Sequence, residues 1–189
     1  SGECMSAVLD TPRHRFSRVQ YERMVEAGVF DPNDRLELLD GEIIDMSPQK
    51  SRHATAVTLV GDALRRVFAT GATVRVQLPF CLDDRSEPEP DVAIVPGYPR
   101  DYRDVHPSRA MLIVEVSDTT LTYDCGSKLA AYARAGVPEY WVLDLAGEVL
   151  KIFRKPESGV YTEQYLRSAN LDVRPPASSQ AIAVRDLLP

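Results

Sequence analysis

The sequence contains little cysteine, and its three cysteines, Cys4, Cys81 and Cys125, are far apart and form no CxxC pair. Because the cysteines are odd in number, widely spaced and without a CxxC pair, the sequence suggests neither a disulfide framework nor a structural zinc site. No run of about 18 apolar residues suggests a membrane span, and the N-terminus lacks the apolar core of a signal peptide. We therefore expect a soluble protein of the reducing cytoplasm, with no membrane partner.

Positive charge is also scarce, because 28 acidic residues outnumber 22 basic ones and leave a net charge of -6. This balance argues against a protein that coats nucleic acid through bulk charge, so any nucleic-acid contact has to be local. With 189 residues, of which 44% are hydrophobic, the chain can bury a core. No repeat or linker interrupts it. We expect one domain over residues 16–189 after a tail at 1–15, of which 1–4 resemble an expression remnant.

Three segments have the signals of helices. Residues 17–28 begin with a capping box, in which Ser17 and Gln20 satisfy each other's backbone N–H groups. Apolar residues recur at helical spacing through 53–71, which predicts a helix packed on the core. A third helix is predicted over 123–136.

The segments between these helices have the patterns of strands. Asp40-Gly41 favours the positive φ of a tight turn and predicts a β-hairpin, one arm of which carries Glu37. Further strands are predicted at 74–82, 91–96, 112–117 and 160–167, with a strand pair over 139–154. Helices mixed with strands in this way predict the α/β class.

Glu115 lies in the middle of the apolar run "LIVEVS", where an ionised carboxylate costs several kcal/mol unless a positive group meets it. Alternation places Asp91 on one face of the strand at 91–96 and Glu115 on one face of the strand at 112–117. If these strands are neighbours, the two carboxylates converge and need a shared cation or proton. Mg²⁺ and Mn²⁺ suit such oxygen ligands, so we predict a metal site.

Lys128 is a candidate for the positive group. It follows the Glu115 strand in the first turn or so of the predicted helix, from where it can point back toward the acids. Two acids, an ammonium group and a helix N-terminus together suit a phosphate, and metal-activated water could then hydrolyse a phosphodiester. The plainer alternative is an exposed lysine paired with Asp124 four residues earlier.

Four segments, "RLELLDGEI", "EPDVAIV", "LIVEVS" and "YDCGSKLAAYARAGVPEYWVLD", resemble the Uma-type, DUF820-like restriction endonucleases of the PD-(D/E)XK phosphodiesterase superfamily. The resemblance runs from about Phe16 to Arg154. It implies a restriction-endonuclease-like fold, in which helices flank a mixed central β-sheet and an N-terminal helix and β-hairpin precede it. It also implies a Mg²⁺- or Mn²⁺-dependent endonuclease that acts on DNA as a homodimer.

The same resemblance assigns roles to individual residues. The "PD" element is Pro90-Asp91, and the "(D/E)XK" element begins at Glu115 but has Ser117 in place of lysine. The resemblance implies that the lysine has migrated to Lys128 and that Glu37 is the N-terminal acid of the site. The metal ligands that it implies are Asp91, Glu115 and the Val116 carbonyl.

Other readings of these residues stay open. Glu37 could face water on the polar side of its hairpin. His53 and Arg52 could contact a phosphate or belong to a solvated loop, and Gln77 points away from the apolar stripe of its strand and could approach the site. The whole chain could be a non-catalytic binding module with a nuclease fold, or a carboxylate-pair hydrolase in which Glu115 and Asp91 act as acid and base without a metal.

Overall fold

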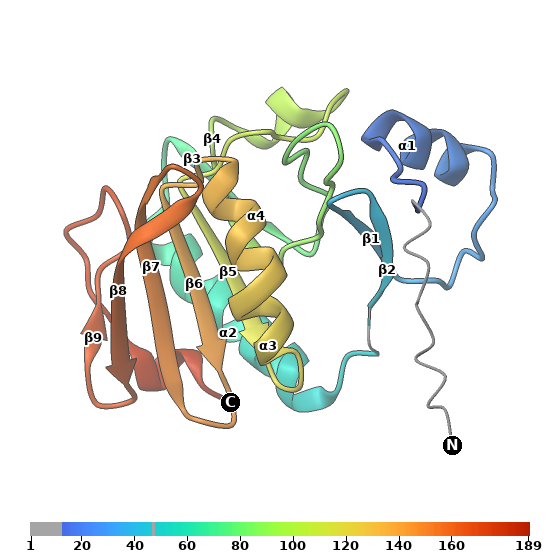
Figure 1. Cartoon of the computed structure of the whole chain (residues 1–189). Coiled ribbons are helices and arrows are strands. Elements are labelled where there is room, and N and C mark those ends of the chain that lie inside the picture. The colour runs from blue at the N-terminus through green and yellow to red at the C-terminus, as the bar shows by residue number, and fades with distance from the viewer. Residues whose placement is uncertain (1–12, 47) are drawn as a thin grey trace, which may run out of the picture.

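A computed structural model describes residues 13–46 and 48–189, and a mixed β-sheet lies at its centre (Figure 1). The strands of this sheet are β3 (Ala72–Val76), β4 (Val92–Pro96), β5 (Leu112–Ser117), β6 (Glu139–Asp144), β7 (Val149–Glu157) and β8 (Val160–Ser168). They lie side by side in this order. Only β5 and β6 pair in parallel, whereas the other neighbours are antiparallel. The α/β class and the mixed sheet are thus confirmed.

Helices cover both faces of the sheet (Figure 1). On one face α2 (Ser51–Val67) buries apolar residues such as Val60 and Leu64 against β4 and β5. The other face is covered by α3 (Leu121–Tyr123), a π-helical turn (Asp124–Lys128) and α4 (Leu129–Arg134). This second group supplies the crossover that the parallel pair β5–β6 requires. Among the described helices, none is both long and apolar enough to cross a membrane.

The N-terminal part forms the predicted helix and hairpin, α1 (Arg18–Glu26) and the strands β1 (Leu36–Leu39) and β2 (Glu42–Asp45). The capping box is present, because the Ser17 hydroxyl accepts from the Gln20 N–H at 3.2 Å. Asp40 and Gly41 have φ values of 51° and 78°, as the hairpin turn requires. The remaining elements are β9 (Asp172–Val173), β10 (Ile182–Ala183) and 3₁₀ helices at Pro99–Tyr102 and Val184–Leu187. The predicted tail at 1–15 lies mostly outside the described residues.

Several predicted elements have bounds that differ from those expected, such as the helix at 53–71, which spans Ser51–Val67, and two of these departures concern the site. The strand at 74–82 stops at Val76, because Gln77 has a φ of 49° and turns the chain out of the sheet. The helix at 123–136 starts at Leu121 and contains the π-helical turn instead of being regular. Such a turn inserts an extra residue and rotates the side chains that follow it. Both departures lie beside the candidate site.

Candidate active site

Asp91 and Glu115 meet because β4 and β5 are neighbours in the sheet. Val92 pairs with Val114, so Asp91, directly before β4, lies opposite Glu115. The Asp91 N–H donates to Glu115 Oε2 at 3.3 Å, and the Val116 N–H donates to Asp91 Oδ2 at 2.8 Å. Both residues are buried. The Glu115 carboxylate contacts Lys128 and Tyr132, whereas the Asp91 carboxylate contacts His53 of α2. The two residues are therefore neighbours across β4 and β5, as strand alternation predicts, but their carboxylates contact different groups.

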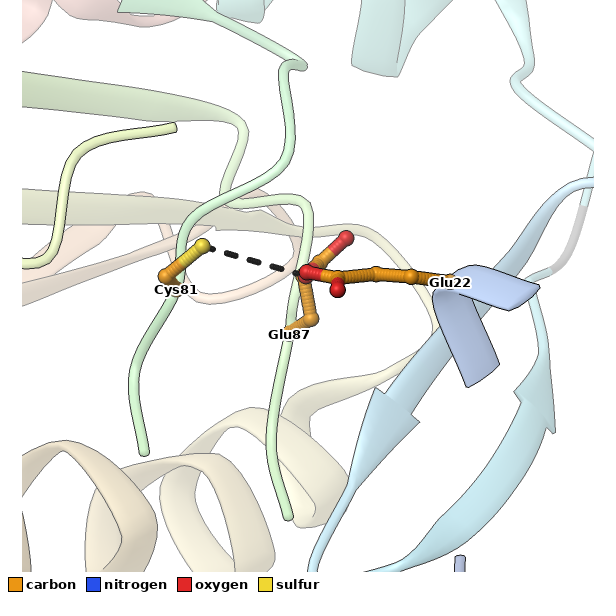
Figure 2. A group of neighbouring side chains, drawn as sticks. All are labelled: Glu22, Cys81 and Glu87. Atoms are coloured by element: carbon orange, nitrogen blue, oxygen red, sulfur yellow. Dashed lines mark hydrogen bonds between the residues drawn. The ribbon is translucent and has the colours of Figure 1, made fainter. Parts of the chain in front are cut away.

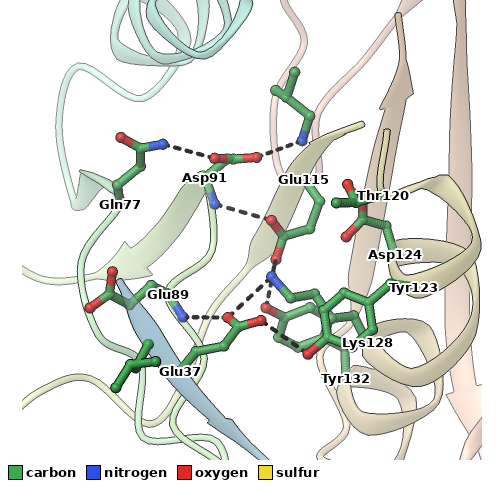
Figure 3. A network of polar contacts seen from close by, with 12 residues as sticks. Glu37, Gln77, Glu89, Asp91, Glu115, Thr120, Tyr123, Asp124, Lys128 and Tyr132 are labelled. Carbon is green, nitrogen blue, oxygen red and sulfur yellow. Dashed lines mark hydrogen bonds and ion pairs between the residues drawn. The ribbon is translucent and has the colours of Figure 1, made fainter. Parts of the chain in front are cut away.

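Lys128 supplies the positive charge that Glu115 needs inside its apolar strand (Figure 3). Its Nζ lies 2.9 Å from Glu115 Oε1 and 3.2 Å from Glu37 Oε2. The three residues are only 4%, 3% and 1% exposed, in the order Lys128, Glu115 and Glu37. The alternatives of an exposed lysine and of a water-facing Glu37 are therefore wrong, since the helix turns Lys128 inward.

Two tyrosines complete this buried group, and the sequence reasoning assigned neither of them a role. Tyr132 donates its hydroxyl hydrogen to Glu115 Oε1 at 2.9 Å, and Tyr123 donates to Glu37 Oε1 at 3.0 Å. The Glu89 N–H donates to Glu37 Oε2 at 3.1 Å. The four-residue spacing of Lys128 and Tyr132 was the available signal, because it places both on one helical face.

The buried group holds more carboxylates than cations. Burial raises the pKa of Glu115 to about 8. The Lys128 ammonium group opposes this rise, whereas the carboxylates of Asp91, Asp124 and Glu37 reinforce it. Burial lowers the pKa of Lys128, but the carboxylates of Glu115 and Glu37 outweigh it and raise that pKa well above its usual value. Lys128 therefore keeps its proton, and the site can accept further positive charge.

Asp91 is held by two more of the predicted site residues. Gln77 Nε2 donates to Asp91 Oδ1 at 3.0 Å, and His53 Nε2 lies 3.2 Å from Asp91 Oδ2. Burial acts to raise the pKa of Asp91, but the contacts with His53, the Val116 N–H and Gln77 hold it below its usual value. The hydrogen bond to Asp91 raises the pKa of His53. Arg52 instead donates to the Leu145 carbonyl at 2.8 Å and stays apart from this group.

A cavity of about 610 Å³ opens beside these residues. Its lining comes from the hairpin, the start of α2, β5 and the segment that follows it, and includes Arg35, Glu37, Lys50, His53, Asp91, Glu115, Val116, Asp124 and Lys128. Neither Arg52 nor Gln77 is among its lining residues. The cavity therefore brings the predicted acids, lysine and histidine together with two further basic side chains.

The donors at the cavity suit a divalent metal ion. Carboxylate oxygens from Asp91 and Glu115, together with the Val116 backbone, match the hard ligands that Mg²⁺ and Mn²⁺ prefer. These ions need only one or two carboxylates and keep several waters. Such a site therefore needs no third protein side chain as a ligand. Among the described residues, Asp91, Glu115 and His53 do not form a group of three whose ligand atoms all lie within 4.8 Å of one another.

A group that does meet this spacing, Glu22, Cys81 and Glu87, lies outside the cavity (Figure 2). We call it the outer acid cluster. Cys81 Sγ donates to Glu87 Oε2 at 3.8 Å, and Arg18 contacts Glu22 at 2.5 Å and Cys81 Sγ at 3.6 Å. Because Arg18 and Glu22 belong to α1, these contacts tie α1 to the chain around 81–87.

The outer acid cluster should make the stability of the protein depend on pH. Burial and the Glu22 carboxylate raise the pKa of Glu87 to about 7, above its unfolded value near 4.5. The stabilisation by this proton is present below about pH 4.5 and is lost as the pH rises through 7. Glu87→Gln mimics the protonated side chain, so we expect the variant to gain about 1–2 kcal/mol over the wild type at pH 8 and nothing at pH 4.5. Urea denaturation at both pH values measures this, and an equal difference at both would contradict it.

Comparison with known proteins places these observations in a family. Residues 18–185 match the model of the Uma2 family, which is described as "Putative restriction endonuclease". The crystal structure of "a putative nuclease belonging to DUF820" from Anabaena variabilis ATCC 29413 superposes with a TM-score of 0.73 at 14% identity, over 91% of this chain and 97% of that one. No curated protein matches. Because the family match spans most of the sequence and the nuclease fold agrees with it, the chain belongs to the Uma2 family of restriction-endonuclease-like proteins.

Proposed function

We propose that this protein is a metal-dependent phosphodiesterase that cleaves DNA. The observation that carries the proposal is the pairing of Asp91 with Glu115 across β4 and β5, beside the buried Lys128 and at the wall of a cavity. The family match and the nuclease fold of the structural neighbour support the same chemistry.

Asp91, Glu115 and the Val116 backbone would hold Mg²⁺ or Mn²⁺. When bound, such an ion lowers the pKa of water and neutralises charge on a phosphate. Burial, reinforced by the nearby carboxylates of Asp91, Asp124 and Glu37, raises the pKa of Glu115 to about 8. A bound divalent cation would favour the ionised form of Glu115 and offset the charge of these carboxylates.

The surrounding side chains fix the carboxylates in place. Lys128 and Tyr132 both bind Glu115 Oε1, which directs Oε2 toward the side of Asp91. Because Lys128 keeps its proton, it acts as a cation that stabilises negative charge on the phosphate, and it does not act as a base. Glu37 holds Lys128 from the other side, which restricts the position of its ammonium group.

DNA would bind through local positive charge. Arg35 and Lys50 line the cavity, and α2 begins beside it without a side-chain cap, so its first N–H groups are available to a phosphate. His53 in its first turn adds a third contact. Cleavage of both strands of a duplex needs two such sites, which the homodimer implied by the resemblance would supply.

Cleavage of supercoiled plasmid tests this function. We expect the wild type to nick plasmid in Mg²⁺ or Mn²⁺ and not in EDTA, and Asp91→Asn to lose the activity because one ligand carboxylate is gone. Asp144→Asn is the matched control, because Asp144 is also buried but does not line the cavity. Asp144 accepts a hydrogen bond from the Gly147 N–H, and the side-chain oxygen of asparagine can accept the same bond. It should nick like the wild type.

Other results would point to the alternatives. Cleavage that persists in EDTA would refute the metal dependence. If neither duplex nor single-stranded DNA is cut, yet calorimetry shows Mn²⁺ binding that Asp91→Asn abolishes, the chain is a metal-binding nuclease fold without turnover on DNA.

A further inference from the structure

On the premise of the function proposed above, we infer that the cavity takes an unpaired nucleotide, whose base lies on apolar side chains of the β1–β2 hairpin while its phosphate lies beside Lys128. The substrate is accordingly single-stranded DNA, or one strand of a duplex where the bases have separated. This assignment goes beyond the binding of phosphates through local positive charge, because it adds a contact to the base.

The charged groups of the site are recessed. Asp91, Glu115 and Lys128 are only 7%, 3% and 4% exposed, so a phosphate reaches them by entering the cavity, and the nucleotides on either side of it follow. The cavity volume of about 610 Å³ is in the range of small-molecule sites, roughly 300–1,000 Å³, and suits a nucleotide better than a section of duplex. A single strand can bend into such a space, whereas a duplex is stiff and keeps its bases stacked.

The hairpin presents a mixed wall to this cavity. Glu37 of β1 pairs directly with Ile44 of β2, and the Met46 N–H donates to the Arg35 carbonyl at 2.8 Å, which continues the hairpin beyond the two strands. Residues directly opposite each other share a face of a hairpin, and so do alternate residues along one strand. All four residues line the cavity. The face that carries Glu37 to Lys128 therefore also carries two apolar side chains.

The apolar part of the lining remains open to a ligand. Ile44 and Met46 are partly exposed, Pro48 is exposed, and all three line the cavity. Tyr123 adds a partly exposed ring, whose hydroxyl group is fixed by its hydrogen bond to Glu37 (Figure 3). Apolar and aromatic side chains stack on bases, whereas a sugar-phosphate backbone needs hydrogen-bond donors and positive charge. These side chains suit a base.

The two parts of the lining are close enough for one nucleotide to contact both. Lys128 Nζ lies 3.2 Å from Glu37 Oε2, and Ile44 is the direct cross-strand neighbour of Glu37. Side chains in such a pair are separated by about 4.5–5.5 Å at their Cβ atoms. The apolar wall therefore begins one side chain away from the ammonium group, and Arg35 and Lys50 are available to the neighbouring phosphates.

Binding of an intact duplex makes the opposite prediction. A protein that holds a duplex by its phosphates neutralises several of them at once, and this chain has a net charge of -6. The bases of an intact duplex stay stacked and paired, so they would leave the apolar wall uncovered. Removal of the bases would then not weaken binding. The contribution of the base to affinity thus separates the two substrates.

Fluorescence anisotropy with the full chain in Ca²⁺, which also takes oxygen ligands, tests the assignment without an activity measurement. The probes are a strand of about ten thymidines, the same strand with every base removed, and the thymidine strand paired with its complement. We expect the thymidine strand to bind at least about tenfold more tightly than either of the other two. In Mn²⁺, it should also be cut at least about tenfold faster than the duplex.

Met46→Asn tests the apolar wall itself. It should raise the Kd for the thymidine strand at least about threefold and leave the Kd for the base-free strand unchanged, because only the base contacts the wall. A variant that merely disturbed the fold would weaken both. Leu166→Ala is the matched control, since Leu166 is an exposed apolar residue of β8 that does not line the cavity. It should bind all three probes like the wild type.

The possible failures are distinguishable. Equal binding of the thymidine and base-free strands, or equal cleavage of single strand and duplex, overturns the inference, and metal-dependent nicking of plasmid would still leave the proposed function intact. An equal increase of both Kd values in Met46→Asn also overturns the place of the base. If no form of DNA is cut while the thymidine strand keeps its base-dependent affinity, the proposed cleavage fails and the base site stands.

Discussion

Replacement of Lys128 by methionine is expected to lower the free energy of unfolding by about 3–5 kcal/mol and to abolish metal-dependent nicking. The variant leaves Glu37 and Glu115, both almost fully buried, without the ammonium group that lies 3.2 Å and 2.9 Å from them. Removal of one partner from a buried charge network costs this much because the remaining charge is neither solvated nor paired. Urea denaturation measures the first effect and plasmid cleavage the second.

Two further variants show whether the loss comes from the unpaired acids. Lys128→Met combined with Glu37→Gln should recover about 1 kcal/mol or more relative to Lys128→Met alone, since one buried charge has been removed. Lys155→Met removes an exposed lysine that pairs with Glu163 and should leave the denaturation midpoint unchanged. A loss below about 1 kcal/mol for Lys128→Met would contradict the buried network.

Replacement of Glu115 by glutamine should separate activity from stability. We expect nicking to fall at least about 10²-fold, because glutamine has the shape of the ligand but lacks the charge that would hold the cation. The loss of stability should be less than half of that in Lys128→Met, since Glu37 still pairs with Lys128 and Tyr132 can still donate to the amide oxygen. Plasmid nicking and urea denaturation of the same preparation measure both quantities.

Glu139→Gln is the matched control for this experiment. Glu139 is a buried carboxylate, 4% exposed, and pairs with Arg154 at 2.8 Å, but it does not line the cavity. We expect this variant to lose stability and to keep its activity per folded molecule. Equal activity of Glu115→Gln and the wild type would remove Glu115 from the proposed mechanism.

The part of the site on the sheet could be predicted because strand alternation is a local property. "LIVEVS" and "PDVAIV" each carry one acid at a position whose face is fixed by the two-residue period. Once β4 and β5 pair, Asp91 lies opposite Glu115. The cost of a buried carboxylate also required a cation near Glu115, and Lys128 is that cation.

Other features depended on contacts between distant segments, which no local pattern encodes. Glu37 pairs with a lysine 91 positions away only because the β1–β2 hairpin lies against the helix that follows β5. The positive φ of Gln77, which ends β3 early, places its amide against Asp91. The alternation in residues 78–82 continued the strand pattern, and nothing in it marked the change of direction.

The sequence by itself determined which residue types face one another across two strands, because side-chain direction in a strand follows from backbone geometry alone. It also determined that Glu115 needed a positive partner, because the free energy of an unpaired buried charge is prohibitive in any fold. Only the tertiary structure decided that Lys128 is buried, that Tyr132 and Tyr123 hold the acids, and that His53 lies beside Asp91. These contacts arise from the packing of helices and hairpin on the sheet, a property of the whole chain.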